Sequence, residues 1–315
     1  MPSRHLVDPE MEPLLVMAAA MDLSAGKESP FMKALLAAPA PTSETVEMRE
    51  VLMPGPKDAP PVRGLVYAPK DAQAQRPAIL HIHGGGYITG APEMSAPSNL
   101  AYAEKFGAVV LSVDYRLAPG AKHPGPVEDC YAALAWLHGQ AEALNIDRTR
   151  IIVSGESAGG GLAAALALLA RDRQEYALAY QHLIFPMLDD RTVTRTDRSP
   201  YVGQFVWTPE LNRLGWTSLL DAAPGSAKVS PYAAAARAED VSGLPPTYIA
   251  CGALDLFIDE NLAYATRLIH AGVPTELHVY PGAPHGFHMV TEAKVARQAA
   301  RDSRAALQAA LAPRG

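Results

Sequence analysis

Cysteine is almost absent from this sequence, in which Cys130 and Cys251 are the only two among 315 residues. So few thiols cannot form a disulfide framework or a thiolate metal site, and they are typical of a reducing compartment, so we expect a cytoplasmic protein. An excess of positive charge is also lacking, since 27 basic and 33 acidic residues give a formal net charge of −6. Nucleic acid is therefore not expected as a partner.

Long apolar runs are missing as well, because none approaches the roughly 20 residues that a membrane-spanning helix needs. The apolar part of the N-terminal stretch MEPLLVMAAAMDL covers only residues 14–21, and Asp8, Glu10 and Glu12 precede it. A secretory signal would carry positive charge at that place. We interpret the stretch as an amphipathic helix and expect no membrane contact.

What the sequence does contain is a regular alternation of strand and helix patterns from about Glu44 onward. Near-continuous apolar runs such as PAILHIHGG (77–85) and GAVVLSVDY (107–115) are typical of strands buried on both faces of a parallel sheet. Helical patterns lie between the strands, for example at 97–106 and 126–144, and a further helix ends the chain. The alternation predicts a doubly wound α/β sheet.

Two segments do not fit this alternation. The first 43 residues or so look helical with loops, and an overlong connection begins at about residue 187. Connections of this length in a compact domain usually form lids or binding elements. The second segment carries several aromatic residues, namely Tyr201, Phe205, Trp207 and Trp216.

The first sign of chemistry is the stretch IIVSGESAGGG (151–161), where a strand pattern meets a helix pattern without a spacer. Gly-x-Ser-x-Gly at such a junction is typical of a nucleophile elbow, whose small flanking residues permit a tight, strained turn. The turn would raise the Ser157 hydroxyl above the sheet edge. It would leave the Ala158 N–H unpaired at a helix N-terminus, which favours an anion. Alone, the motif could also be a glycine-rich helix start that serves only packing.

A second glycine cluster, HGGGY at 83–87, follows another buried strand. Three successive glycines let backbone N–H groups turn toward one point, as an oxyanion hole requires. A phosphate-binding loop would need the Walker lysine or the glycine spacing of a dinucleotide fold, and this segment has neither. Beside the elbow, we interpret the cluster as an oxyanion hole rather than as a flexible loop.

A nucleophilic serine needs a base, and the base needs an orienting carboxylate. His285 follows the last strand pattern, at the sheet edge where the elbow also emerges. His288 is the nearby alternative. Asp255 directly follows the preceding strand, whereas the acidic pair at 259–260 suits a helix start, where the dipole favours it. We therefore expect a triad in the chain order Ser157, Asp255, His285.

Together these motifs resemble the hormone-sensitive-lipase-like family of α/β-hydrolase carboxylesterases. The resemblance covers nearly the whole chain, and the segments that carry it are HGGGY (83–87), DYRLAP (114–119), GESAGG (155–160), DLFIDE (255–260) and HGF (285–287). Glu156 departs from the family's pattern, in which aspartate is commoner, but it keeps the charge.

The resemblance implies one α/β-hydrolase domain over residues 1–315, with a mostly parallel eight-stranded sheet. It implies a helical cap formed by about residues 1–43 and 187–223. It also implies that the N–H groups of Gly85, Gly86 and Ala158 bind the oxyanion. Members of this family are often dimers, which leaves a homodimer open.

The expected activity is hydrolysis of small, short- to medium-chain acyl esters through an acyl-enzyme, with no metal and no cofactor. An amidase or peptidase with the same triad is one alternative. A ligand receptor without catalysis is another, although the receptors on this scaffold lack the histidine that this chain has. A lipase acting on lipid droplets is less favoured, because no anchor or long apolar lid is visible. The candidate pocket residues are Tyr87, Phe205, Trp207, Trp216, Phe257 and Phe287.

Overall fold

The computed structural model describes residues 2–20, 30–56, 59–71 and 75–313, so Met1 and residues 21–29 of the predicted cap lie outside the described residues. The described strands are β1 (Val46–Met53), β2 (Val62–Pro69), β3 (Arg76–Ile82), β4 (Val109–Asp114), β5 (Ile146–Glu156), β6 (Gln181–Ile184), β7 (Thr247–Gly252) and β8 (Thr275–Tyr280). They form an eight-stranded sheet in the order β1-β2-β4-β3-β5-β6-β7-β8. β2 runs antiparallel to β1 and β4, and the pairs from β4 to β8 are parallel. The predicted mostly parallel eight-stranded sheet is thus confirmed.

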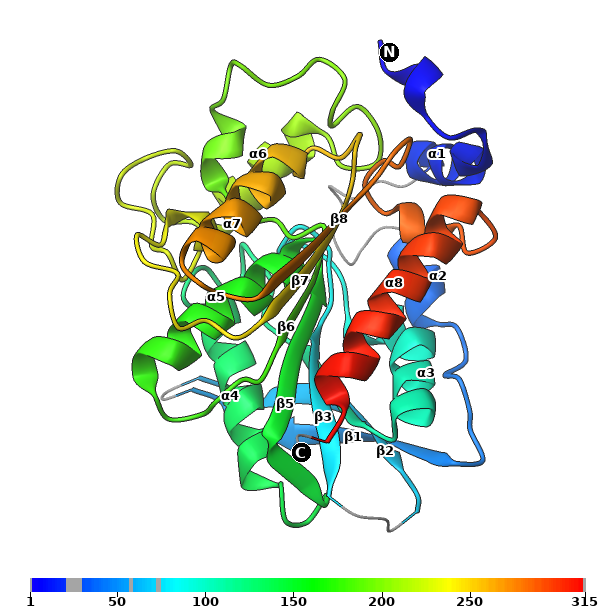
Figure 1. Ribbon diagram of the computed structural model, residues 1–315, viewed down its shortest axis with the longest axis vertical. Coiled ribbons are helices and arrows are strands. Elements are labelled where there is room, and N and C mark those ends of the chain that lie inside the picture. Colours follow the sequence, from blue (N-terminus) through cyan, green and yellow to red (C-terminus); the bar gives the residue numbers. More distant parts are fainter. Residues whose placement is uncertain (1, 21–29, 57–58, 72–74, 314–315) are drawn as a thin grey trace.

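Helices cover both faces of this sheet, as a doubly wound fold requires. The described α-helices are α1 (Glu12–Ala20), α2 (Pro30–Leu36), α3 (Ala96–Phe106), α4 (Gly125–Gly139), α5 (Ala158–Arg173), α6 (Pro209–Leu219), α7 (Ile258–His270) and α8 (Lys294–Leu311). α3 and α8 lie on one face, and α4, α5 and α7 lie on the other (Figure 1). Short 3₁₀ helices complete the described elements: η1 (Arg4–Leu6), η2 (Pro9–Met11), η4 (Pro92–Ser95), η5 (Asp190–Val193), η6 (Ala235–Arg237) and η7 (Phe287–Met289).

The core follows from the continuous apolar strands. Every residue of β3 is buried, and its successive side chains point to alternate faces of the sheet. Leu80 and Val153 belong to the cluster that contains α4, α5 and α7, whereas Ile79 and Ile152 belong to the cluster that contains α3 and α8. Because successive side chains of a strand point to opposite faces, one apolar strand serves two layers of helices.

One predicted element is shorter than the pattern suggests. The helix expected over 126–144 is α4, which ends at Gly139. Turns follow it, and Asn145 adopts a left-handed backbone conformation with φ of 55° just before β5 begins. Asparagine tolerates this conformation better than most residues, so the chain reverses direction where the apolar pattern would have allowed the helix to continue.

Each of the two segments outside the alternation contributes a helix, α1 or α6, to the same end of the molecule, whereas α2 lies further along beside α8 (Figure 1). The two segments touch each other, since the Ser3 hydroxyl donates a hydrogen bond of 2.8 Å to the Gln204 side chain. Among the described residues, no helix has the length and apolar character needed to cross a membrane.

Candidate active site

Ser157, His285 and Asp255 follow β5, β8 and β7 and form a continuous hydrogen-bonded chain. The Ser157 Oγ lies 2.9 Å from His285 Nε2, and His285 Nδ1 lies 2.7 Å from Asp255 Oδ2. The other carboxylate oxygen accepts a hydrogen bond from the Phe257 N–H at 2.9 Å, which fixes the carboxylate plane. Asp255 is fully buried, and Ser157 and His285 are each only 6% exposed.

The local sequence explains why Ser157 stands at a sharp turn. Its backbone has φ of 56° and ψ of −121°, a region that residues with a side chain rarely adopt. The surrounding structure holds this strained residue from both sides, because its N–H donates to Ile184 O and its carbonyl accepts from Met187 N–H, each at 2.9 Å. A Cβ at Gly159 would come within 2.7 Å of the His83 carbonyl carbon, so only glycine permits this approach.

The glycine loop after β3 lies beside the nucleophile, since a Cβ added at Gly84 would lie 3.4 Å from the Ser157 Cβ. Gly85 and Gly86 have positive φ values of 118° and 60°, a conformation that glycine adopts far more readily than other residues. Ala158, the next residue after Ser157, begins α5. Within the described residues, none of the N–H groups of these three residues donates a hydrogen bond, so all three remain available to a ligand.

Tyr115 of the DYRLAP segment supports this loop, a role that the sequence did not suggest. Its ring stacks on His83 with centroids 4.3 Å apart, and its hydroxyl donates to His83 O at 3.0 Å. The Ala118 N–H donates to Tyr87 O at 2.9 Å, at the other end of the loop. The segment after β4 therefore fixes both ends of the glycine loop.

Glu156, the residue before the nucleophile, has a specific partner. Its two carboxylate oxygens lie 3.0 and 3.1 Å from His81 Nε2. Burial opposes the ionisation of Glu156, but its electrostatic and hydrogen-bonding interactions, chiefly with His81, have the larger effect. The pKa of Glu156 is therefore lowered from its usual value. The glutamate thus keeps a charge on the sheet face opposite α5.

Two of the predicted pocket residues lie beside the base. The Phe257 ring meets the His285 ring edge-on at 5.3 Å, and the Trp207 ring lies 6.3 Å from it. The tip of Trp207 also lies against Gly86. Trp207 follows Val206, which has φ of 62°, an outlier for a β-branched residue. Such strain persists where the surrounding structure imposes it, often at functional sites.

Within the described residues, the remaining predicted pocket residues form no ring contact with His285. Tyr87 and Trp216 are buried against each other in the core, with ring centroids 5.2 Å apart. Phe205 and Phe287 are buried in the cluster that also holds Met11 of the N-terminal segment.

Phe185 was missed by the sequence reasoning. It follows β6, has φ of 36° and places its ring 4.8 Å from the His285 ring. No motif marks it, and only the position of β6 between β5 and β7 brings it to the site. The ring of His288, the alternative base, also lies near the Phe185 ring, with centroids 5.2 Å apart. The serine hydroxyl is bonded to His285 instead.

Comparison with known proteins places the chain in a family. A family model described as "alpha/beta hydrolase fold" matches residues 79–289. Carboxylesterase NlhH of Mycobacterium tuberculosis is 35% identical over 254 residues, which cover 77% of this chain and 75% of that protein. An arylesterase of Saccharolobus solfataricus is 30% identical, with 82% of this chain and 84% of that protein covered.

Among solved structures, a bacterial heroin esterase has a TM-score of 0.90 and 38% sequence identity, and the match covers 98% of this chain and 99% of that one. The fold and these relatives define the chain as an α/β hydrolase, and it belongs to that family. More narrowly, it is a member of the hormone-sensitive-lipase-like group of carboxylesterases, which confirms the resemblance seen in its motifs.

Proposed function

We propose that this protein is a carboxylesterase that hydrolyses small, short- to medium-chain acyl esters through an acyl-enzyme. The observation that carries the proposal is the hydrogen-bonded chain from Ser157 Oγ through His285 to Asp255, at 2.9 and 2.7 Å. The unpaired N–H groups beside the serine support it. The names of the relatives, a carboxylesterase and an arylesterase among them, agree with this chemistry.

In the first half of the proposed reaction, Ser157 Oγ attacks the ester carbonyl carbon while its proton passes to His285 Nε2. The carbonyl electron pair moves onto oxygen, where the N–H groups of Gly85, Gly86 and Ala158 stabilise the negative charge. Asp255 holds the imidazole in the tautomer with Nδ1 protonated and stabilises the imidazolium that forms. When the intermediate collapses, His285 returns the proton to the departing alkoxide, and an alcohol leaves.

In the second half, water attacks the acyl-enzyme and gives a proton to His285 Nε2. The second tetrahedral intermediate uses the same N–H groups. Its collapse breaks the bond to Ser157 Oγ, which recovers the proton from His285, and the carboxylic acid is released. Every step uses groups of this chain and water.

The restriction to small esters rests on how the site is covered. Ser157 and His285 are nearly buried, and Trp207 closes the space beside Gly86. Met11 and Leu14 of the N-terminal segment are fully buried in the cluster that contains Phe205 of the long connection. We propose that these two segments form the cap over the site. A covered site of this kind limits the acyl length that it accepts.

The test of the proposed function is labelling with an organophosphate, which should add one phosphoryl group per chain at Ser157. Ser157→Ala should lower kcat by about 10⁴- to 10⁶-fold, the scale for loss of a triad member, while circular dichroism shows an unchanged fold. Labelling of another serine together with loss of activity would reject this nucleophile. A comparison of p-nitrophenyl esters with the matched anilides distinguishes the esterase from an amidase, and we expect hydrolysis of the esters to dominate.

A further inference from the structure

A short segment after β6, Pro186–Asp189, connects the parts of the site that the sequence places far apart. The Met187 N–H donates to Ser157 O at 2.9 Å, so the segment supports the strained nucleophile. The Met187 carbonyl accepts a hydrogen bond of 3.1 Å from the hydroxyl of Tyr87, the residue that follows the three glycines. The backbone of one residue, Met187, therefore contacts both the nucleophile and the end of the glycine loop.

The first turn of α7 holds this segment from the other side. The Glu260 carboxylate accepts hydrogen bonds from the Leu188 N–H at 2.6 Å and the Asp189 N–H at 3.3 Å, and from the Thr192 hydroxyl. Asn261 donates from Nδ2 to the Pro186 carbonyl at 2.8 Å. Because α7 begins three residues after Asp255, these bonds join the carboxylate end of the triad to the segment that supports the nucleophile.

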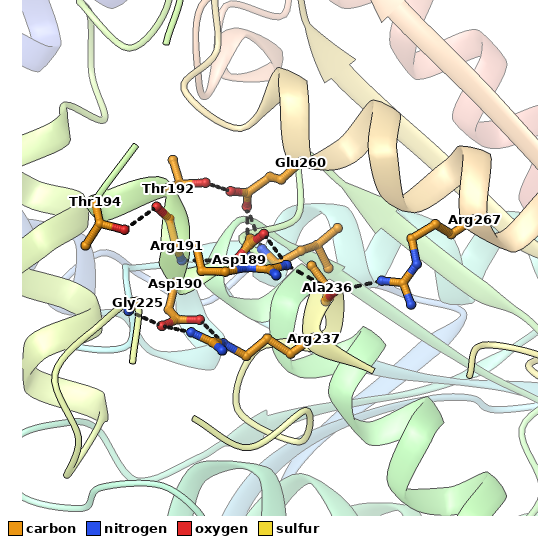
Figure 2. A network of polar contacts seen from close by, with 11 residues as sticks. Asp189, Asp190, Arg191, Thr192, Thr194, Gly225, Ala236, Arg237, Glu260 and Arg267 are labelled. Carbon is orange, nitrogen blue, oxygen red and sulfur yellow. Dashed lines mark hydrogen bonds and ion pairs between the residues drawn. The ribbon is translucent and has the colours of Figure 1, made fainter. Parts of the chain in front are cut away.

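Around Glu260, further polar contacts fix the start of the long connection (Figure 2). The buried Asp190 pairs with Arg237 at 2.5 Å, and the Arg267 guanidinium of α7 donates to Ala236 O at 2.7 Å. These contacts join η5, η6 and α7 to one another. Glu260 and Asn261 bind the peptide groups on either side of Met187, because Glu260 accepts from the Leu188 N–H and Asn261 donates to the Pro186 carbonyl.

Glu260 is more than a helix-start charge, which is all that its place in the sequence suggests. It does lie in the first turn of α7, as expected, but it is 5% exposed. Among the described residues, no basic side chain forms an ion pair with it, and burial raises the pKa of Glu260 well above its usual value. Asp259, its neighbour, is half-exposed and pairs with Arg195 at 3.4 Å. Burying an acid without a counter-charge is unfavourable. A role at the helix start therefore does not explain why Glu260 is buried and accepts three hydrogen bonds.

We propose that Glu260 is a positioning residue, which fixes the segment Pro186–Asp189 and thereby the geometry of Ser157 relative to Asp255 and the glycine loop. This inference rests on the proposed esterase activity. Glu260 touches no reacting atom in this proposal. It acts through the Leu188 N–H, which shares a peptide group with the Met187 carbonyl that accepts from Tyr87. The N–H of the same Met187 donates to Ser157 O. Displacing reacting groups by about 1 Å can lower a rate by about 10²-fold, so a small shift of this segment has a measurable effect.

The test compares Glu260→Met with Glu260→Gln. Methionine fills a similar volume but leaves the Leu188 and Asp189 N–H groups without an acceptor. The glutamine amide oxygen can accept from Leu188 N–H while its NH₂ group donates to the Thr192 hydroxyl. With p-nitrophenyl butyrate, we expect Glu260→Met to lower kcat by about 10-fold or more and to change KM by less than about threefold. Glu260→Gln should retain kcat within about threefold of wild type.

Asp259→Asn is the matched control, because it removes an acidic group from the same helical turn and has no contact with the segment. It should keep wild-type kcat. A second readout is the inhibition constant of a trifluoromethyl ketone, which forms a tetrahedral adduct with an active serine. In Glu260→Met this constant should rise by the same factor by which kcat/KM falls. If Glu260 only stabilised the fold, Glu260→Met would lower the unfolding midpoint. It would leave both kcat and the inhibition constant of the folded enzyme unchanged.

If Glu260→Met does not fold, Thr192→Val and Thr192→Ser decide the question. Serine keeps the hydroxyl donor to Glu260 and valine removes it, so kcat of the valine variant should be lower by about threefold. Equal kcat values for folded Glu260→Met and wild type, or for the two Thr192 variants, would overturn the inference. A wild-type protein that neither hydrolyses esters nor is labelled at Ser157 would instead overturn the proposed function.

Discussion

Replacement of Gly86 by alanine tests the glycine loop and the position of Trp207 at once. Gly86 has φ of 60°, and an added Cβ would overlap the tip of the Trp207 ring, with Cζ2 at 2.8 Å and Cζ3 at 2.9 Å. Carbon atoms in contact lie about 3.5–4.0 Å apart. The ring or the loop must therefore move by on the order of 1 Å, and the left-handed backbone adds about 1–3 kcal/mol of strain for a residue with a side chain.

Two effects then lower the rate. A shift of about 1 Å in a group that contacts the reacting atoms can cost about 10²-fold, and loss of one oxyanion donor costs about 10²- to 10³-fold. We expect kcat/KM of Gly86→Ala for p-nitrophenyl butyrate to fall by about 100-fold. The fall should lie mainly in kcat, because the oxyanion forms in the transition state and the tetrahedral intermediate and is absent from the bound ester.

Trp207→Phe shortens the ring that the new methyl group meets. The effects of substitutions at residues in contact are not additive. If the overlap is the main cause, the double variant Gly86→Ala/Trp207→Phe should be about 10-fold more active than the product of the two single effects predicts. Gly139→Ala is the control, because Gly139 lies in α4 and an added Cβ there meets nothing within 4 Å. Activity of Gly86→Ala within threefold of wild type, or strictly additive effects in the double variant, would refute this reasoning.

Three further predictions concern the base, the substrate and the stability of the fold. His285→Ala should lose at least about 10⁴-fold in kcat while His288→Ala keeps most of it, and the reverse result would reassign the base. Across p-nitrophenyl esters, kcat/KM should rise with acyl length by up to about 0.8 kcal/mol per buried methylene, peak between about C4 and C8 and fall steeply toward C16, whereas a rise that continues to C16 would contradict the cap. Burial lowers the pKa of His182 to about 4, between the hydroxyls of Ser154 and Ser303 at 2.9 Å. The unfolded chain therefore binds a proton first as the pH falls below about 6.5, and between there and pH 4 the free energy of unfolding should drop by up to about 3 kcal/mol. Urea unfolding at several pH values measures this drop, and an equal drop in His182→Gln would assign it to other groups.

Much of this protein could be predicted from local sequence. A continuous apolar strand, a glycine pair around a serine and the start of a helical pattern are features of neighbouring residues, because backbone strain and periodic burial act over a few positions. Ser157 stands at its strained turn for this reason, and the closeness of Gly159 to His83 shows why glycine is needed there. The same reasoning placed His285 and Asp255 after successive strands, since the carboxyl ends of parallel strands share one edge.

Other features depend on which strands are neighbours, and only the tertiary structure decided those. Phe185 reaches His285 because β6 lies between β5 and β7, and nothing in the residues around Phe185 specifies that order. Glu260 suits a helix start by its position, but the partners that make it a buried acceptor are peptide groups some 70 residues earlier in the chain. Tyr115 likewise stacks on His83 only because β4 pairs with β3. Hydrophobic periodicity determines which face of an element is buried, whereas the partner that covers this face is determined by the packing of the whole sheet.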